Sequence, residues 1–373
     1  MKNKKFNLKN YLVNFVVILL VAALFMPITP LVATGAAVTA FVTGTALSFM
    51  HIDAVSLMAI QVEIWQNHIE EELFKDNAFL RLSYNADDYL INSKAVHIPQ
   101  SGGSGNVVKN RSSLPATIRT RTDADVIYLI DEYTSDPVRI PHADTKELSY
   151  DKRSSVLGED VDKLIEEVAE NMLLNWVSSP AYGTYSSSVL PAASILLTTG
   201  ANVVASAPSA TGVRKAMTQT DLQSARAFLK QQKRWKEGKM YGMITPAQEA
   251  ELFPADSLTT ATYMASVTEA ERREGVMYKC QDFKLMTRTT ILRTQANKTI
   301  IAYGAAGAAT DCEAAFFWYQ ESVEFAFGGV DMFEQLKAPT LYSDVYSFLV
   351  RAGGRARRQD YGGICLLQQA PST

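Results

Sequence analysis

Residues 151–177 read DKRSSVLGEDVDKLIEEVAENMLLNWV, and this stretch decides the fold class. From Gly158 onward its apolar residues recur every three or four positions, the spacing of one helical face. Acidic residues fill the other face, which we expect to meet water, whereas residues 144–157 are less regular and could form a separate or kinked piece. At a rise of about 1.5 Å per residue the stretch is a rod of roughly 40 Å, which we interpret as a spine. The acidic residues of that other face are Glu159, Asp162, Glu166, Glu167 and Glu170.

The composition is that of an ordinary globular protein. The chain has 373 residues, of which 47% are hydrophobic and 20% charged, enough for one large or two modest domains. A net charge of -3 argues against a strongly cationic nucleic-acid binder. Cys280, Cys312 and Cys365 are far apart, which argues against a disulfide framework and a zinc knuckle, and the four histidines are equally scattered.

Signatures of catalysis are missing from the sequence. It contains neither a phosphate-binding loop nor a dinucleotide-binding glycine motif. The glycine run at 102–105 lacks the spacing of a nucleophile elbow. Glu166, Glu167 and Glu170 are better explained as a solvated helix face than as paired acids and bases. We therefore expect no catalytic residues, cofactor or metal, and a protein that is not an enzyme.

Residues 1–57 differ from the rest of the chain. Four lysines precede the apolar run YLVNFVVILLVAALFM at 11–26, and small residues follow at 33–37. This pattern is typical of a secretory signal, although the run is short for a membrane span. Three interpretations stay open: an export signal or anchor, upstream sequence joined to a protein that begins at Met58, or a buried arm. A membrane is an expected partner only if these residues are a genuine part of the protein.

A basic hairpin is expected between residues 94 and 122. The strand-like KAVHIP at 94–99 runs into a glycine-rich tip that includes Gly102 and Gly105, where positive φ angles are accessible. The return limb at 107–122 carries four cations. The hairpin is either a mobile surface feature or an arm that grips a partner. Its cations are Lys94, Lys109, Arg111, Arg119 and Arg121.

The remaining pattern indicates an α+β protein. Thr218 and Asp221 have the spacing of a capping box ahead of a helix at 221–236, and Thr245, Pro246 and Gln248 open another. Lys230, Lys233, Arg234, Lys236 and Lys239 cluster near the end of the 221–236 helix, where a helix C-terminus explains them better than nucleic-acid binding does. We also expect a helix at 62–74, a linker at 198–209, a helical turn at 321–327, a glycine turn at 353–354, and strands at 125–134, 241–244, 275–280, 284–292, 314–319, 331–336, 342–350 and 363–368.

The order of these segments over residues 58–369 resembles the major capsid protein of tailed bacteriophages. The matching pieces are the 62–74 helix, the glycine-tipped hairpin, the acidic spine helix, the stretch YGMITP at 241–246 and the closing strands from 314 onward. The resemblance implies the shared tailed-phage capsid fold, with an extended β-hairpin loop, a peripheral domain with the spine helix, and a mixed α/β axial domain. The implied divisions are 1–57 (apolar segment), 58–92 (N-terminal arm), 93–124 (hairpin loop), 125–209 (peripheral), 210–328 (axial) and 329–373 (strands returning to the peripheral domain).

The same resemblance implies a function. The chain would be a structural subunit of an icosahedral viral shell, forming homo-pentamers and homo-hexamers around double-stranded DNA that it holds without sequence specificity. It would be found in the virion after assembly in the host cytoplasm, with scaffolding, portal and decoration proteins as further partners. The alternatives are a membrane-tethered or exported binding protein and a cellular nanocompartment shell protein of the same fold.

The resemblance also implies which residues touch a neighbouring subunit. The hairpin would lie across the neighbour, so that its cations face the acidic side of the spine helix. Some relatives crosslink a hairpin lysine to a neighbour's asparagine, but for Lys94 and Lys109 ordinary salt bridges are the preferred expectation. The expected contact residues are Lys94, Gly102, Gly105, Lys109, Arg111, Arg119 and Arg121 on the hairpin and Glu159, Glu166 and Glu170 on the helix.

Overall fold

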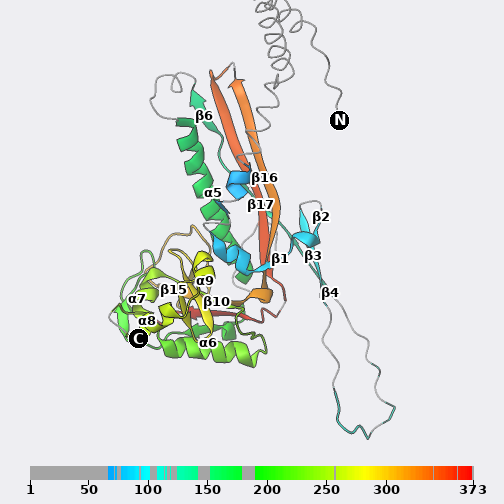
Figure 1. Cartoon of the computed structure of the whole chain (residues 1–373), viewed down its shortest axis with the longest axis vertical. Helices are drawn as coiled ribbons and strands as arrows, with labels where there is room; N and C mark the ends of the chain where they lie inside the picture. Colours follow the sequence, from blue (N-terminus) through cyan, green and yellow to red (C-terminus); the bar gives the residue numbers. More distant parts are fainter. Residues whose placement is uncertain are drawn as a thin grey trace, which may run out of the picture. The chain divides into compact units, whose positions relative to one another are not determined.

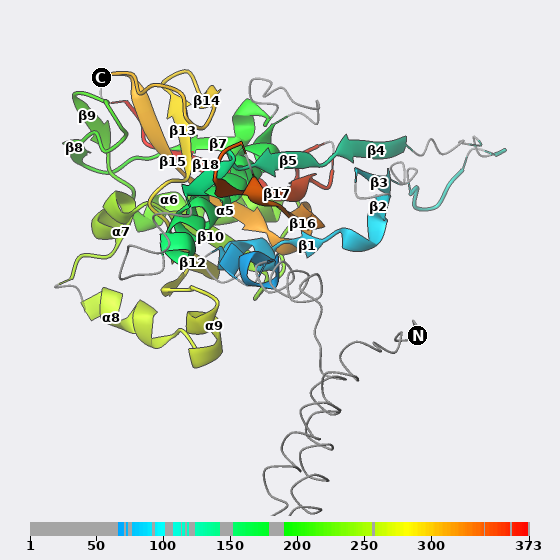
Figure 2. The same cartoon turned by 90° about the horizontal axis from the view of Figure 1, so that it is seen from above.

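The computed structural model describes thirteen stretches of the chain, all within the compact unit Gln66–Thr373 (Figures 1 and 2). The expectations for residues 1–57 lie outside the described residues, as does part of the 62–74 helix, of which 66–70 and 72–73 are helical. The described residues are 66–70, 72–73, 77–91, 94–100, 107–112, 114–115, 118, 124–141, 152–178, 190–255, 258–338, 340–358 and 360–371.

The spine is the helix α5 (Lys152–Val177), as the apolar spacing predicts. It is continuous from Lys152, so residues 152–157 belong to it and are not a separate piece. Its apolar face packs along β17 and β5 (Figure 1). The buried residues of that face include Leu157, Val161, Leu164, Ile165, Val168, Met172 and Trp176.

The sheet beside α5 has five strands built around one long antiparallel hairpin, β16 (Val323–Ala338) and β17 (Ser343–Ala356). β1 (Tyr84–Asn85) runs parallel to β16. β5 (Asp131–Thr134) and β6 (Val138–Pro141) pair in turn with β17. The expected helical turn at 321–327 is wrong beyond the short η4 (Gln320–Ser322), because β16 begins at Val323 and stays paired with β17.

The second sheet has eight strands, and its centre is the antiparallel pair β10 (Met240–Ile244) and β15 (Asp311–Tyr319). Every residue of β10 is buried. β18, the last strand of the chain, pairs with β15 in this sheet. The resemblance described above implies that residues 329–373 return to the peripheral domain. The other strands are β7 (Ile195–Leu197), β11 (Tyr278–Cys280), β12 (Phe283–Thr287), β13 (Leu292–Gln295), β14 (Ile300–Ile301) and β18 (Ile364–Gln368).

Short helices cover this sheet, and their capping boxes form as predicted. α6 (Gln219–Gln231) packs on β18 and β7, and Thr218 and Asp221 cap each other at its start. At α7 (Pro246–Leu252), Thr245 and Gln248 do the same and Pro246 takes the first turn. α8 (Leu258–Ala265) and α9 (Glu269–Arg273) follow. The expected linker at 198–209 instead contains β8 (Asn202–Val204), which pairs with β9 (Val213–Lys215).

The expected strand at 125–134 is two strands in different sheets. β4 (Ala124–Leu129) pairs with β3 (Ala95–Gln100), whereas β5 pairs with β17, and the change occurs at Ile130. β4 is therefore the return strand of the hairpin. The return limb predicted at 107–122 is wrong, because its described residues, 107–112, 114–115 and 118, lie in no strand.

Trp176 joins α5 to both sheets. Its indole Nε1 donates a 2.9 Å hydrogen bond to the carbonyl oxygen of Glu324 in β16. Its ring lies 5.8 Å from the rings of Phe316 and Trp318 in β15, and 5.8 Å from Phe79 of η1 (Ala78–Leu82). The side chain is fully buried. One residue thus holds the helix, the five-stranded sheet and the eight-stranded sheet together.

The glycine pair at 353–354 lies inside β17 and does not form the expected turn. A Cβ on Gly354 would come 2.2 Å from the carbonyl oxygen of Glu324 and 2.6 Å from Met172 Sδ. Gly354 is therefore explained by the close approach of β17 to its neighbours beside Trp176, and Gly353 by its approach to Ile130, and neither by turn chemistry.

We predict that Gly354→Ala destabilises the protein by about 1–3 kcal/mol or more, because the added methyl group meets rigid backbone. Gly158→Ala is the matched control, because a Cβ there meets nothing within 4 Å inside α5. That change should stabilise the helix by roughly 0.5–1 kcal/mol. Urea unfolding monitored by Trp fluorescence measures both. Equal effects of the two substitutions would contradict the packing described here.

Candidate functional site

The first candidate surface is the hairpin made by β3 and β4, whose root is buried and whose described loop residues are exposed. Val96 of β3 and Tyr128 of β4 are buried at the root, in a cluster with Ile130, Ala86 and Ala326 of β16. The antiparallel register continues to the pair Gln100 and Ala124. Among the described loop residues, Val107, Leu114 and Ile118 are 99%, 80% and 95% exposed. Lys109 and Arg111 are exposed as well.

A buried carboxylate anchors the root of this hairpin. Glu324 of β16 is fully buried and pairs in register with Arg355 of β17. Its Oε2 lies 3.6 Å from Arg357 Nε. Arg355 stacks 5.8 Å from the ring centre of Tyr128, and Arg357 stacks 3.8 Å from that of Tyr84. The cluster therefore connects the return strand of the hairpin to the five-stranded sheet.

Burial shifts the pKa values of the groups in this root cluster. It raises the pKa of Glu324 to about 7, while Tyr128, Arg357 and Arg355 act in the opposite direction. Burial also raises the pKa of Tyr128, and the nearby Glu324 carboxylate adds to that rise. A carboxylate with such a pKa changes charge near neutral pH, so the root of the hairpin is sensitive to pH in that range.

The second candidate surface is the acidic face of α5, and it is only partly solvated. Glu159, Asp162 and Glu166 are exposed as expected. The expectation that Glu170 meets water is wrong, because it is only 2% exposed and neither carboxylate oxygen makes a hydrogen bond of ordinary geometry within the described residues. Burial raises the pKa of Glu170 to about 7; Thr290 and Arg288 oppose this rise, and Glu166 and Glu167 add to it.

Arg288 is a positive charge that interacts electrostatically with Glu170. It follows β12, and its backbone N–H donates a 3.1 Å hydrogen bond to the carbonyl oxygen of Ile244. Its guanidinium donates a 2.6 Å hydrogen bond to Asn77 Oδ1 and lies 5.4 Å from the ring centre of Phe79. Burial lowers the pKa of Arg288, whereas Glu170 and Glu166 raise it. Arg288 thus joins β12 of the eight-stranded sheet to η1, and its charge interacts with α5.

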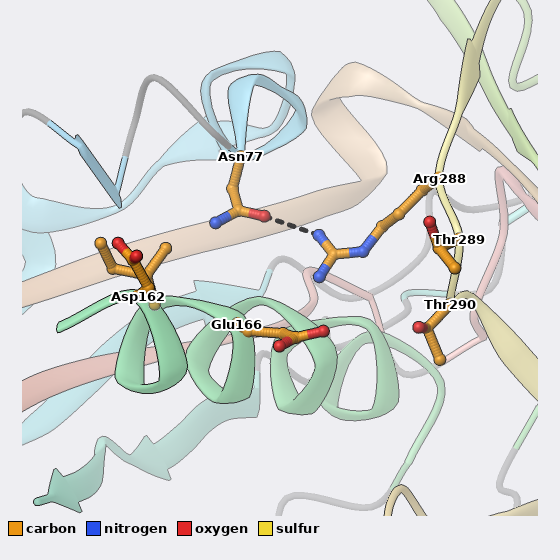
Figure 3. Close-up of a pocket in the computed structure, with 7 residues that line it drawn as sticks. Asn77, Asp162, Glu166, Arg288, Thr289 and Thr290 are labelled. Carbon is orange, nitrogen blue, oxygen red and sulfur yellow. Dashed lines mark hydrogen bonds between the residues drawn. The ribbon is translucent and has the colours of Figure 1, made fainter. Parts of the chain in front are cut away.

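A pocket of about 240 Å³ opens beside this link (Figure 3). Asp162 and Glu166 of α5 line one side, and Arg288 lies opposite them with its bond to Asn77. Its lining contains neither histidine nor cysteine. The remaining lining residues are Ile165, Thr289 and Thr290.

The third candidate surface follows α6. The helix ends at Gln231, earlier than the 221–236 helix predicted from sequence, so of the clustered cations only Lys230 lies in its last turn. Lys233, Arg234, Lys236 and Lys239 come after the helix. Lys230, Lys233 and Lys236 are exposed.

The described residues show neither a metal-ligand cluster nor a membrane-spanning helix. They contain no group of three or more His, Cys, Asp or Glu side chains placed to hold a metal ion. No helix among them is long and apolar enough to span a membrane.

Solved structures share the arrangement of these elements. The capsid of Ralstonia phage GP4 is similar with a TM-score of 0.54 at 13% identity, over 75% of this chain and 84% of that one. The cyanophage Pam1 capsid gives 0.54 at 11% identity, over 78% and 91%. The capsid of cyanophage P-SCSP1u gives 0.51 at 17% identity, over 78% and 87%. No protein-family model matches the sequence, and no curated protein is similar to it.

The chain has the tailed-phage capsid-protein fold. Identities of this size establish the fold alone. The fold class expected from the order of segments is therefore confirmed.

The structure separates the expected contact residues of this capsid fold into three groups. The exposed ones are available to a partner, and Glu170 is not, because it is buried inside the chain. The hairpin tip and part of its return limb lie outside the described residues. The exposed residues are Lys94, Lys109, Arg111, Glu159 and Glu166. Those outside the description are Gly102, Gly105, Arg119 and Arg121.

Sequence reasoning missed Arg288 and Glu324, which join the parts of the capsid fold. Arg288 lies more than a hundred residues from Glu170 in the sequence, and no local pattern relates the two. Glu324 was placed in a helical turn, where a glutamate is unremarkable. The alternation of β16 was the available signal, but the bulge between Phe327 and Gly329 interrupts it.

We predict that Glu170→Gln reduces the pH dependence of stability. The folded protein holds a proton on Glu170 up to about pH 7, whereas an unfolded glutamate releases it near 4.3. Between these values the native state binds more protons, so stability falls as pH rises through the window, by on the order of 2–3 kcal/mol from this residue. Glu324 adds a similar slope of its own.

Urea unfolding at several pH values between 4.5 and 8 measures the change. The wild type should lose stability across this window, and the Glu170→Gln variant should lose distinctly less. Glu159→Gln, on the exposed part of the same helix, is the control and should retain the wild-type slope. A Glu170→Gln variant with the wild-type slope would contradict the burial of this carboxylate.

Proposed function

We propose that this chain is the structural subunit of an icosahedral viral capsid that assembles into pentamers and hexamers and encloses double-stranded DNA. The observation that carries the proposal is the shared fold with three phage capsid structures over about three quarters of the chain. The role is structural and not enzymatic. Copies close into rings through heterologous contacts, and the rings close into a shell.

The exposed hairpin supports assembly from many copies. A monomer gains nothing from placing Val107, Leu114 and Ile118 almost entirely in water, whereas a neighbouring copy would remove their apolar surface from water at about 25 cal/mol per Å². The buried root cluster around Glu324 holds the base of the hairpin to the sheet, so less freedom is lost when the arm docks.

Charge supports the direction of docking. Lys94, Lys109 and Arg111 are exposed on the hairpin, and Glu159 and Glu166 are exposed on α5. In the proposed shell the hairpin of one copy lies across α5 of the next, and this complementarity sets register and association rate more than affinity.

The assembled protein is located in the virion, after assembly in the host cytoplasm. Scaffolding, portal and decoration proteins are its further partners.

Electron microscopy and size-exclusion chromatography test the proposal. We expect the full chain, or a chain that starts at Met58, to form rings or closed shells of uniform size. Their nucleic-acid content separates a DNA-filled capsid from a shell with protein cargo. A monomer at every concentration and salt tested, with the full chain recovered in membranes, would overturn the proposal and favour a tethered binding protein.

We predict that Lys109→Glu with Arg111→Glu slows or abolishes particle formation, because both charges then repel the neighbour's α5. Adding Glu159→Lys with Glu166→Lys should restore assembly in part, since attraction returns with the signs exchanged. Light scattering during assembly measures the rate. Arg272→Glu with Arg273→Glu, on exposed positions of α9, is the control and should assemble like the wild type. Equal loss in both double variants would refute the hairpin-to-helix contact.

A further inference from the structure

We propose that a basic surface at and after the end of α6 binds the phosphate backbone of the enclosed DNA, an assignment that rests on the proposed capsid function. Residues 222–239 contain six Lys or Arg and one acidic residue, Glu237, a net of +5 in a chain whose total is -3. We call this the α6 basic surface. It consists of Arg226, Lys230, Lys233, Arg234, Lys236 and Lys239.

The helix terminus does not account for these cations. A helix dipole favours positive charge only within its last turn, and α6 ends at Gln231. Lys230 is the single basic residue in that turn. The other four cations after it lie beyond the reach of this effect. These four cations therefore need another explanation, and the ion pairs show which of them are already neutralised.

Half of the surface lies outside the ion pairs of the described residues. Arg226 pairs with Asp282 at 2.6 Å, Lys239 pairs with Glu321 at 2.7 Å, and Arg234 lies 3.9 Å from Asp360. Among the described residues, Lys230, Lys233 and Lys236 form no ion pair, and all three are exposed. Three ammonium groups outside these ion pairs, of which Lys236 also interacts electrostatically with Glu321, lie within seven residues and create a positive potential that attracts anions.

The segment that carries these lysines is held in place. Lys230 Nζ lies 5.0 Å, and the Arg226 guanidinium 5.7 Å, from the ring centre of Trp235. Trp235 itself packs edge-on against Phe283 of the core at 5.2 Å. The backbone N–H of Gly363 donates to Gln232 Oε1 at 2.9 Å. A supported surface loses little freedom when it binds, so its charge is available for affinity.

The chemistry of the surface favours phosphate over an acidic protein. A protein interface has an apolar core inside its polar rim, but residues 219–239 expose no large apolar side chain. Lysines act as point charges that neutralise phosphates without requiring a base sequence. Duplex DNA offers about one charge per 1.7 Å of its axis, dense enough to meet all three lysines. Binding of this kind is independent of DNA sequence, as packaging of a whole genome requires.

Fluorescence polarisation with labelled duplexes of two unrelated sequences tests the inference on the full chain at several salt concentrations. We expect both duplexes to bind alike. Replacing Lys230, Lys233 and Lys236 together by Ala should weaken binding about tenfold or more at low salt. The slope of log K against log salt should become shallower by roughly 2–3, because each lost phosphate contact removes about 0.9.

A control removes the same charge elsewhere. Arg272, Arg273 and Lys337 are exposed, and their joint replacement by Ala should leave affinity and salt slope close to the wild type. The thermal unfolding midpoint of each triple variant should stay near that of the wild type, because the altered side chains are exposed. Equal losses in both triple variants, or no change in either slope, would overturn the inference.

A second probe separates DNA from an acidic protein surface. Poly-glutamate binding that is lost in the Lys230, Lys233 and Lys236 variant, with duplex binding unchanged, would overturn the DNA assignment in favour of an acidic partner. Electron microscopy of the same preparations shows whether a negative result contradicts the DNA-binding inference or the capsid proposal. Wild-type particles together with unchanged DNA binding by the variant would remove this inference alone, whereas missing wild-type particles would remove the proposed function.

Discussion

The burial of Trp176 is the constraint on which the rest of the structure depends. Its indole N–H is bonded to the backbone of β16, its ring contacts two aromatic rings of β15, and Phe79 closes the remaining side. An indole buried without a partner for its N–H would cost about 1–3 kcal/mol, so the ring and the strand must stay in register. Gly354 follows from this, because no side chain fits where β17 passes the same point.

Two buried carboxylates complete the joints around this centre. Glu170 of α5 interacts electrostatically with Arg288, which follows β12 of the eight-stranded sheet, and Glu324 lies where the hairpin meets the five-stranded sheet. Burial raises the pKa of each to about 7, so both joints change charge near neutral pH. Desolvation offsets most of the attraction between buried opposite charges, so neither carboxylate is expected to be a large source of stability.

Around these joints the capsid fold presents three charged surfaces of different character. The hairpin combines exposed cations with exposed apolar side chains, which suits a protein partner. The outer part of α5 is acidic and matches it. The α6 basic surface carries charge without apolar area, which suits a polyanion. The core needs none of these features, and a shell that contacts both its neighbours and its contents would use all of them.

The sequence by itself determined the features that depend on neighbours along the chain. The spine helix followed from apolar spacing, and the capping boxes at Thr218 and Thr245 from side chains three residues apart. Only the tertiary structure decided what depends on distant partners: the burial of Glu170 near Arg288, the division of 125–134 between two sheets, and the glycine beside Trp176. Local patterns record which face of an element is apolar. They do not record which element arrives from far along the chain to cover a polar residue or to exclude a side chain.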